Sequence, residues 1–166
     1  PIAVFSKVIV ISDTAFYPEV EEVIARAVQL LAQLSTTDEE GAVDVRSRIL
    51  ELVEAFFKFH YDSACVPQLI QIVVNDYMEA PMNLKLPQSL DCFSQILTKL
   101  ESDPPFDESF LSEIVLPTQE ILDMPSPDLA AAYSKLLSTL LGFDFVRSSE
   151  LFGHLIELLV VAVKRP

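Results

Sequence analysis

Apolar side chains recur at steps of three and four residues along most of the chain. This is the period of an amphipathic α-helix, whereas the alternation typical of a strand is nearly absent. One short apolar run, residues 8–11, fits either a buried strand or the end of a helix. We expect a helix there, because no other run could pair with a strand. The pattern predicts helices over residues 18–34, 43–59, 66–77, 88–100, 107–122, 127–141 and 149–164.

Proline, glycine and short polar residues mark the ends of these segments. Ser126 before Pro127 is typical of a helix start, and Gly142 of a helix end. Pro117 lies inside the segment 107–122 and predicts a kink there. The segment 127–141 has the most regular apolar stripe in the chain, so Leu136 and its neighbour Leu137 should both face a core.

The helices also recur in pairs. First helices of successive pairs begin near Glu19, Pro67, Phe110 and Glu150, at intervals of roughly 40 to 48 residues, which is typical of HEAT and armadillo repeats. We therefore expect an all-α fold, a right-handed α-α solenoid of HEAT-like hairpins with about seven to eight helices. The alternative is a closed helical bundle whose even spacing arises by chance.

The last predicted helix, 149–164, is apolar nearly all round, which is typical of a helix with neighbours on several sides. The first residue is also not Met. We therefore expect residues 1–166 to form a single solenoid segment, a fragment of a longer HEAT-repeat protein.

The net charge limits the classes of molecule that we expect the chain to bind directly. The chain has a net charge of −14, with 25 acidic and 11 basic residues, and a pI near 4.3. Phosphate-rich partners need clustered Lys and Arg, so we expect neither direct nucleic-acid binding nor binding to an anionic membrane. The longest apolar run, residues 151–163, is too short to span a bilayer. Proteins with basic surfaces are the partners that this charge would attract.

Known catalytic and metal-binding patterns were sought and are absent from the sequence. His60 and His154 stand far apart, and neither has Cys, His or Asp at ligand spacing. His154 is expected to satisfy a local hydrogen bond rather than to bind a metal. The chain has three glycines, too few and too scattered for a phosphate-binding loop. We expect no enzyme activity, no catalytic residues, no metal and no cofactor.

The two cysteines, Cys65 and Cys92, stand far apart on apolar helical patterns. Two reduced core thiols in an intracellular protein are the expected state. A disulfide or a reactive thiol is the alternative.

Several residues between positions 43 and 100 follow a recognisable order. They are Val45, Arg46, Ser47 and Arg48 in one helix, Val66, Pro67, Gln68, Leu69, Val73, Asp76 and Tyr77 in the next, Pro81 and Pro87 in the connection, and Leu90, Lys99 and Leu100 in the following helix. In this order they resemble the later HEAT repeats of the karyopherin-β family of importins and exportins. Within that family the likeness is greatest to the exportins that carry leucine-rich nuclear export signals.

The resemblance implies a nuclear transport receptor that shuttles between nucleus and cytoplasm and binds cargo together with the GTPase Ran in its GTP form. The export-signal groove of such receptors lies in earlier repeats, so the partner-binding residues of this chain stay unknown. Exposed positions on the second helices, 88–100 and 128–141, are candidates because second helices usually line the concave face. The alternative is a HEAT or armadillo scaffold that holds another multiprotein complex together.

Overall fold

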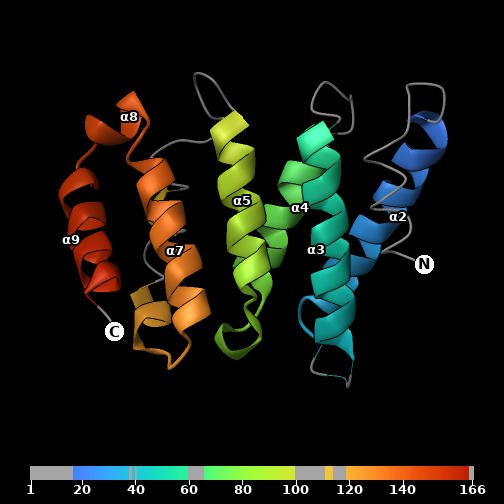
Figure 1. The fold of residues 1–166 in the computed structure, drawn as a ribbon, viewed down its shortest axis with the longest axis horizontal. Coiled ribbons are helices and arrows are strands. Elements are labelled where there is room, and N and C mark those ends of the chain that lie inside the picture. The colour runs from blue at the N-terminus through green and yellow to red at the C-terminus, as the bar shows by residue number, and fades with distance from the viewer. Residues whose placement is uncertain are drawn as a thin grey trace. The chain divides into compact units, whose positions relative to one another are not determined.

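The computed structural model describes residues 17–37, 39, 41–59, 66–99, 111–113 and 119–164. Every regular element within these ranges is a helix, and none is a strand (Figure 1). The predicted all-α class is therefore confirmed. The chain divides into two compact units, and the boundary between Cys92 and Phe93 falls inside one helix.

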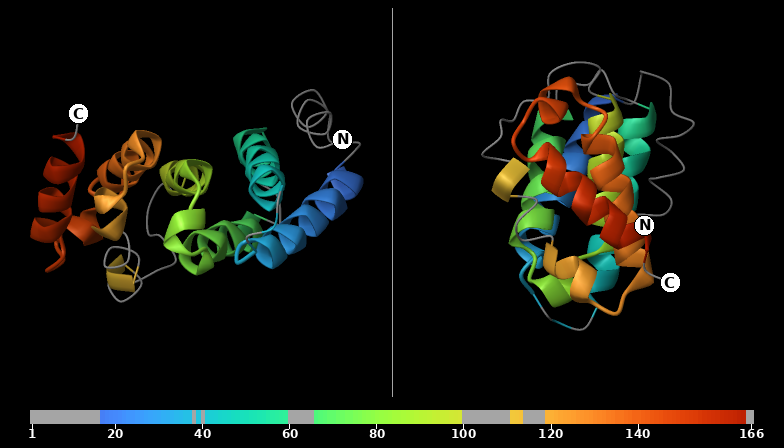
Figure 2. Two further views of the ribbon diagram at one scale, coloured as in Figure 1. Left: turned by 90° about the horizontal axis from the view of Figure 1, so that it is seen from below. Right: turned by 90° about the vertical axis from the view of Figure 1, so that its left-hand side faces the viewer.

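Within the described residues, unit 1 has three long helices and the start of a fourth. Its elements are α2 (Tyr17–Leu34), α3 (Ala42–Phe59), α4 (Val66–Glu79), a 3-10 turn η2 (Met82–Leu84) and the first turns of α5 (Pro87–Lys99). Helix α2 packs against both α3 and α4, and α3 also packs against α4. Seen from below, α2 and α4 lie in one layer and α3 in another (Figure 2).

The core of unit 1 follows directly from the predicted apolar stripes. Helix α3 contributes the largest share, because its apolar residues are spaced to fall on one face. The hydrophobic residues that are at most 1% exposed are Ile24, Val28 and Leu31 on α2, Ile49, Leu50, Leu52, Val53 and Phe56 on α3, Val73 and Tyr77 on α4, and Leu90 and Cys92 on α5.

The turn from α2 to α3 satisfies the free carbonyl groups at the end of α2. Ser35 Oγ donates to the Ala32 carbonyl at 3.1 Å, and Thr37 Oγ1 donates to the Gln33 carbonyl at 3.2 Å. Gly41 then takes a φ of +86°, a left-handed conformation that favours glycine. The predicted loop between these helices is confirmed.

Unit 2 pairs two antiparallel helices joined by a short one. Its elements are the rest of α5, the 3-10 helix η3 (Gln119–Asp123), α7 (Pro127–Leu140), α8 (Asp144–Arg147) and α9 (Phe152–Val163). Helix α7 packs along α9, and η3 contacts both (Figure 1). The predicted stripe of α7 is confirmed, because Tyr133, Leu136, Leu137 and Leu140 are fully buried.

The start of α7 follows the sequence prediction, whereas its end is made differently. Ser126 Oγ accepts a hydrogen bond from the Leu129 amide at 3.3 Å, with proline in the first turn. Gly142 follows the helix but does not adopt a left-handed φ. The carbonyls of Leu137, Thr139 and Leu140 accept from the main-chain amides of residues 141–143. Arg147 donates to the carbonyls of Leu141 and Gly142, just after the helix, at 3.1 and 2.8 Å.

Three features of unit 2 differ from the prediction. The short helix α8 was not predicted, and the last helix begins at Phe152 instead of residue 149, because residues 148–151 form turns. Residues 119–123 form a 3-10 helix, not the end of an α-helix: the Ile121 carbonyl accepts from the Met124 amide, three residues on.

Some predictions lie outside the described residues. These are the run at 8–11, the start of the segment 107–122, the kink at Pro117, and the environments of His60 and Cys65. Among the helices that the structure describes, none combines the length and apolar character needed to cross a membrane.

Candidate functional site

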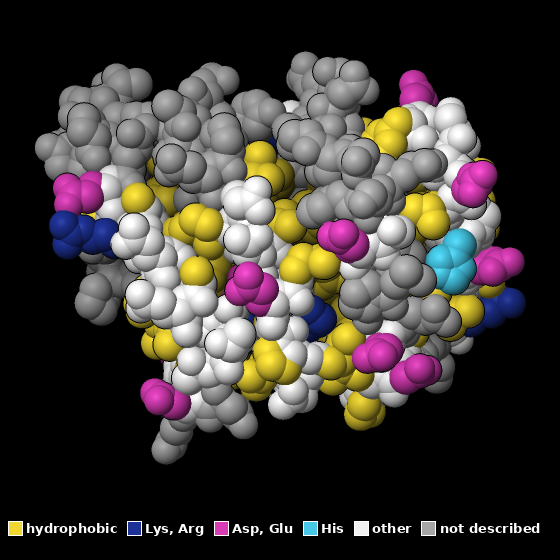
Figure 3. All heavy atoms as spheres, turned by 180° about the vertical axis from the view of Figure 1, so that it is seen from behind, with side chains coloured by type: hydrophobic (Ala, Val, Ile, Leu, Met, Phe, Trp, Pro, Cys, Tyr) yellow, Lys and Arg dark blue, Asp and Glu magenta, His cyan; other side chains and the backbone are white. Residues whose placement is uncertain are grey.

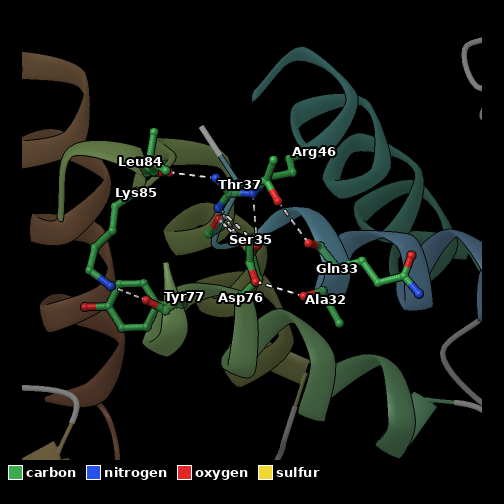
Figure 4. Close-up of polar contacts among 10 residues, drawn as sticks. Ala32, Gln33, Ser35, Thr37, Arg46, Asp76, Tyr77, Leu84 and Lys85 are labelled. Atoms are coloured by element: carbon green, nitrogen blue, oxygen red, sulfur yellow. Dashed lines mark hydrogen bonds and ion pairs between the residues drawn. The ribbon is translucent and has the colours of Figure 1, made fainter. Parts of the chain in front are cut away.

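Unit 1 contains a buried polar cluster where α3, α4 and α5 meet. It consists of Arg46 on α3, Asp76 on α4, Ser89 on α5 and the main-chain carbonyl of Leu84 in η2. Figure 4 shows Arg46, Asp76 and Leu84. The side chains of Arg46 and Asp76 have no exposed surface, and Ser89 is 1% exposed. Charged side chains this deeply buried need compensating partners, which the cluster supplies.

The Arg46 guanidinium grips the Asp76 carboxylate with two parallel hydrogen bonds. Nε donates to Oδ1 and Nη2 donates to Oδ2, each at 3.1 Å. The Arg46 Nη1 donates to the Leu84 carbonyl at 2.9 Å, and Ser89 Oγ donates to Asp76 Oδ2 at 2.8 Å. This two-pronged arrangement matches the planar guanidinium and fixes the relative orientation of α3 and α4.

Lys85 lies at the edge of this cluster, directly after η2, and is partly buried. Its Nζ donates to the main-chain carbonyl of Tyr77 in the last turn of α4. The same ammonium lies 4.6 Å from the centroid of the Tyr77 ring, which is cation–π geometry. Lys85 thus fastens the connection between α4 and α5 to the end of α4 (Figure 4).

Burial shifts the protonation equilibria of this region. It raises the pKa of the Asp76 carboxyl, although the Arg46 guanidinium and the Ser89 hydroxyl act in the opposite direction. It lowers the pKa of Lys85 to about 8, with Asp76 opposing that shift and Arg46 adding to it. Burial is also the main reason why the pKa of the Cys92 thiol is raised.

The geometry of the cluster indicates a structural role, in which it joins helices. Asp76 is 1% exposed and its two oxygens are bound by Arg46 and Ser89, so a substrate has no route to the carboxylate in this arrangement. The cluster can hold helices together. It can also distinguish one packing register from another, because only one register aligns the two Arg46 donors with the Asp76 carboxylate.

Comparisons with known proteins were made for the whole chain. No protein-family model, curated protein or solved structure matches it.

Of the cysteines and histidines in the sequence, the structure describes the side chains of Cys92 in unit 1 and His154 in unit 2. Cys92 is a free thiol that is 1% exposed, as expected of a core cysteine. His154 lies on α9, and its Nε2 is buried without a hydrogen-bond partner among the described residues. The local hydrogen bond that was expected there is thus not made at Nε2. No group of three or more potential metal ligands occurs within the described ranges.

The candidate binding positions on the second helices are partly exposed. On α7 the exposed residues are Pro127, Asp128, Ala131, Lys135 and Ser138, and at the end of α5 they are Thr98 and Lys99. On one face of the molecule the acidic side chains lie scattered among apolar and polar ones (Figure 3). Helix α9 also exposes apolar side chains, with Ile156, Val160, Val161 and Val163 between 39% and 69% exposed.

Sequence analysis missed the role of the cluster, although its members carry a signal. Arg46 stands four residues after the buried Ala42 and three before Ile49, so it falls on the apolar stripe of α3. Asp76 likewise stands three residues after Val73 on the stripe of α4. Two opposite charges on facing buried stripes predict a buried ion pair.

Proposed function

We propose that the chain is a segment of an α-solenoid of HEAT-like hairpins that acts as a non-catalytic, protein-binding scaffold in a nuclear transport receptor of the exportin type. In this function the segment supplies part of a curved wall for cargo and Ran-GTP. No chemistry is required of it, because a ligand selects among curvatures by its differential affinity for them.

The packing within unit 1 is the main observation that supports the proposed solenoid. Helix α2 contacts its hairpin partner α3 and also α4, the first helix of the following pair. A hairpin that buries one face on its partner and another on its successor is the unit of a stacked array. The Arg46–Asp76 pair supports the same interpretation, since it joins the second helix of one pair to the first helix of the next.

Two features of the sequence support the proposed role as a transport receptor. They are the order of residues that resembles karyopherin-β repeats and the strongly negative net charge. Arg46, Asp76 and Tyr77, three of the residues on which the likeness to karyopherin-β repeats rests, lie in or beside the cluster. Such residues have a physical reason to recur in stacked hairpins. The net charge of −14 favours partners with basic surfaces and predicts association that weakens as salt rises.

A pull-down with immobilised Ran tests the receptor. The full-length gene product that carries these residues is passed over Ran loaded with a non-hydrolysable GTP analogue or with GDP. The proposal predicts retention on the GTP form and little on the GDP form, with retention falling as salt is raised. Equal retention on both forms, or none on either, would contradict the transport role.

An adaptor in another multiprotein complex is the second candidate, and the exposed apolar side chains of α9 favour it. Ile156, Val160 and Val163 recur at four and three residues along one side of α9, which suits a permanent helix–helix contact. The adaptor predicts one stable partner whose binding does not depend on nucleotide.

A further inference from the structure

We draw no further inference here: the strongest candidate, the apolar surface patch that helix α9 exposes with Ile156, Val160 and Val163, carries none, because nothing in the structure shows what covers it.

Discussion

The junction around Arg46 and the interface between α7 and α9 bury helix faces in different ways. At the junction a guanidinium and a carboxylate, both without exposed surface, meet in two parallel hydrogen bonds. Between α7 and α9 the buried side chains are apolar, among them Leu136, Leu140, Leu155 and Leu158. Arg147, on the short helix α8 between them, stays at the surface, with its side chain 54% exposed.

The two interfaces therefore contribute differently to the stability of the fold and to the specificity of helix packing. An apolar interface gains free energy in proportion to buried area and tolerates small shifts, whereas a buried pair of charges is satisfied in one alignment only. We therefore expect the junction to set the register of its helices and the α7–α9 interface to contribute mainly stability. Each of the following changes tests one side of this contrast.

The largest effect should come from breaking the buried pair on one side. Arg46→Met leaves the Asp76 carboxylate buried without its cation, which should cost about 3–5 kcal/mol of unfolding free energy. Urea unfolding gives the total loss, and amide exchange should place it in α3 and α4 rather than in α7 and α9. Asp76→Asn keeps the volume and should cost nearly as much. A loss below about 1 kcal/mol in both variants would argue against a buried charge pair.

The apolar side of the contrast is tested at Leu136, which is fully buried. Leu136→Ala removes three carbon atoms from a packed core and should cost roughly 2–5 kcal/mol. Its effect on amide exchange should lie in α7 and α9 and spare α3 and α4. Lys135→Ala, an exposed neighbour on the same helix, is the matched control and should change stability by less than about 0.5 kcal/mol.

Lys85 gives the stability of the junction a pH dependence. Burial lowers its pKa in the folded chain to about 8, against an ordinary value of 10.5. The unfolded chain thus binds more protons between these values, and the contribution of Lys85 to stability rises with pH across that window. Compared with Lys85→Met, the wild type should gain on the order of 1–3 kcal/mol between about pH 8 and 10.5. A difference between the two that is constant with pH would contradict the shift.

The smallest effect should come from the helix start in unit 2. Ser126→Ala removes the side chain that accepts from the Leu129 amide and should cost about 1 kcal/mol. Ser138→Ala, an exposed serine within the same helix, should be neutral or slightly stabilising, because alanine has the higher helix propensity. Equal effects at the two positions would mean that Ser126 does not cap the helix.

The helices could be predicted because their signals are local. Each apolar stripe is written into a run of three or four turns, as in residues 43–59, which correspond to α3 within one residue. The 3-10 helix at 119–123 and the short α8 were missed for the opposite reason. Both depend on how neighbouring segments constrain the chain. The hydrogen bonds from Arg147 to the carbonyls of Leu141 and Gly142 likewise come from six and five residues further along.

The cluster could be predicted only in part. The positions of Arg46 and Asp76 on apolar stripes indicate buried charges, but their pairing joins residues 30 apart in the sequence. The contributions of Ser89 and the Leu84 carbonyl depend on the path of the α4–α5 connection, which periodicity does not specify. The lowered pKa of Lys85 likewise depends on burial and on the charges of Arg46 and Asp76, which the fold brings together.

A double-mutant cycle at Arg46 and Asp76 tests most directly whether a buried charge pair joins successive helical hairpins. Unfolding free energies are measured for the wild type, Arg46→Met, Asp76→Leu and the double variant, with amide exchange in α3 and α4 as the local readout. The account predicts a coupling energy of about 2 kcal/mol or more, with the double variant more stable than either single one. Additive losses, with a coupling below about 0.5 kcal/mol, would contradict it.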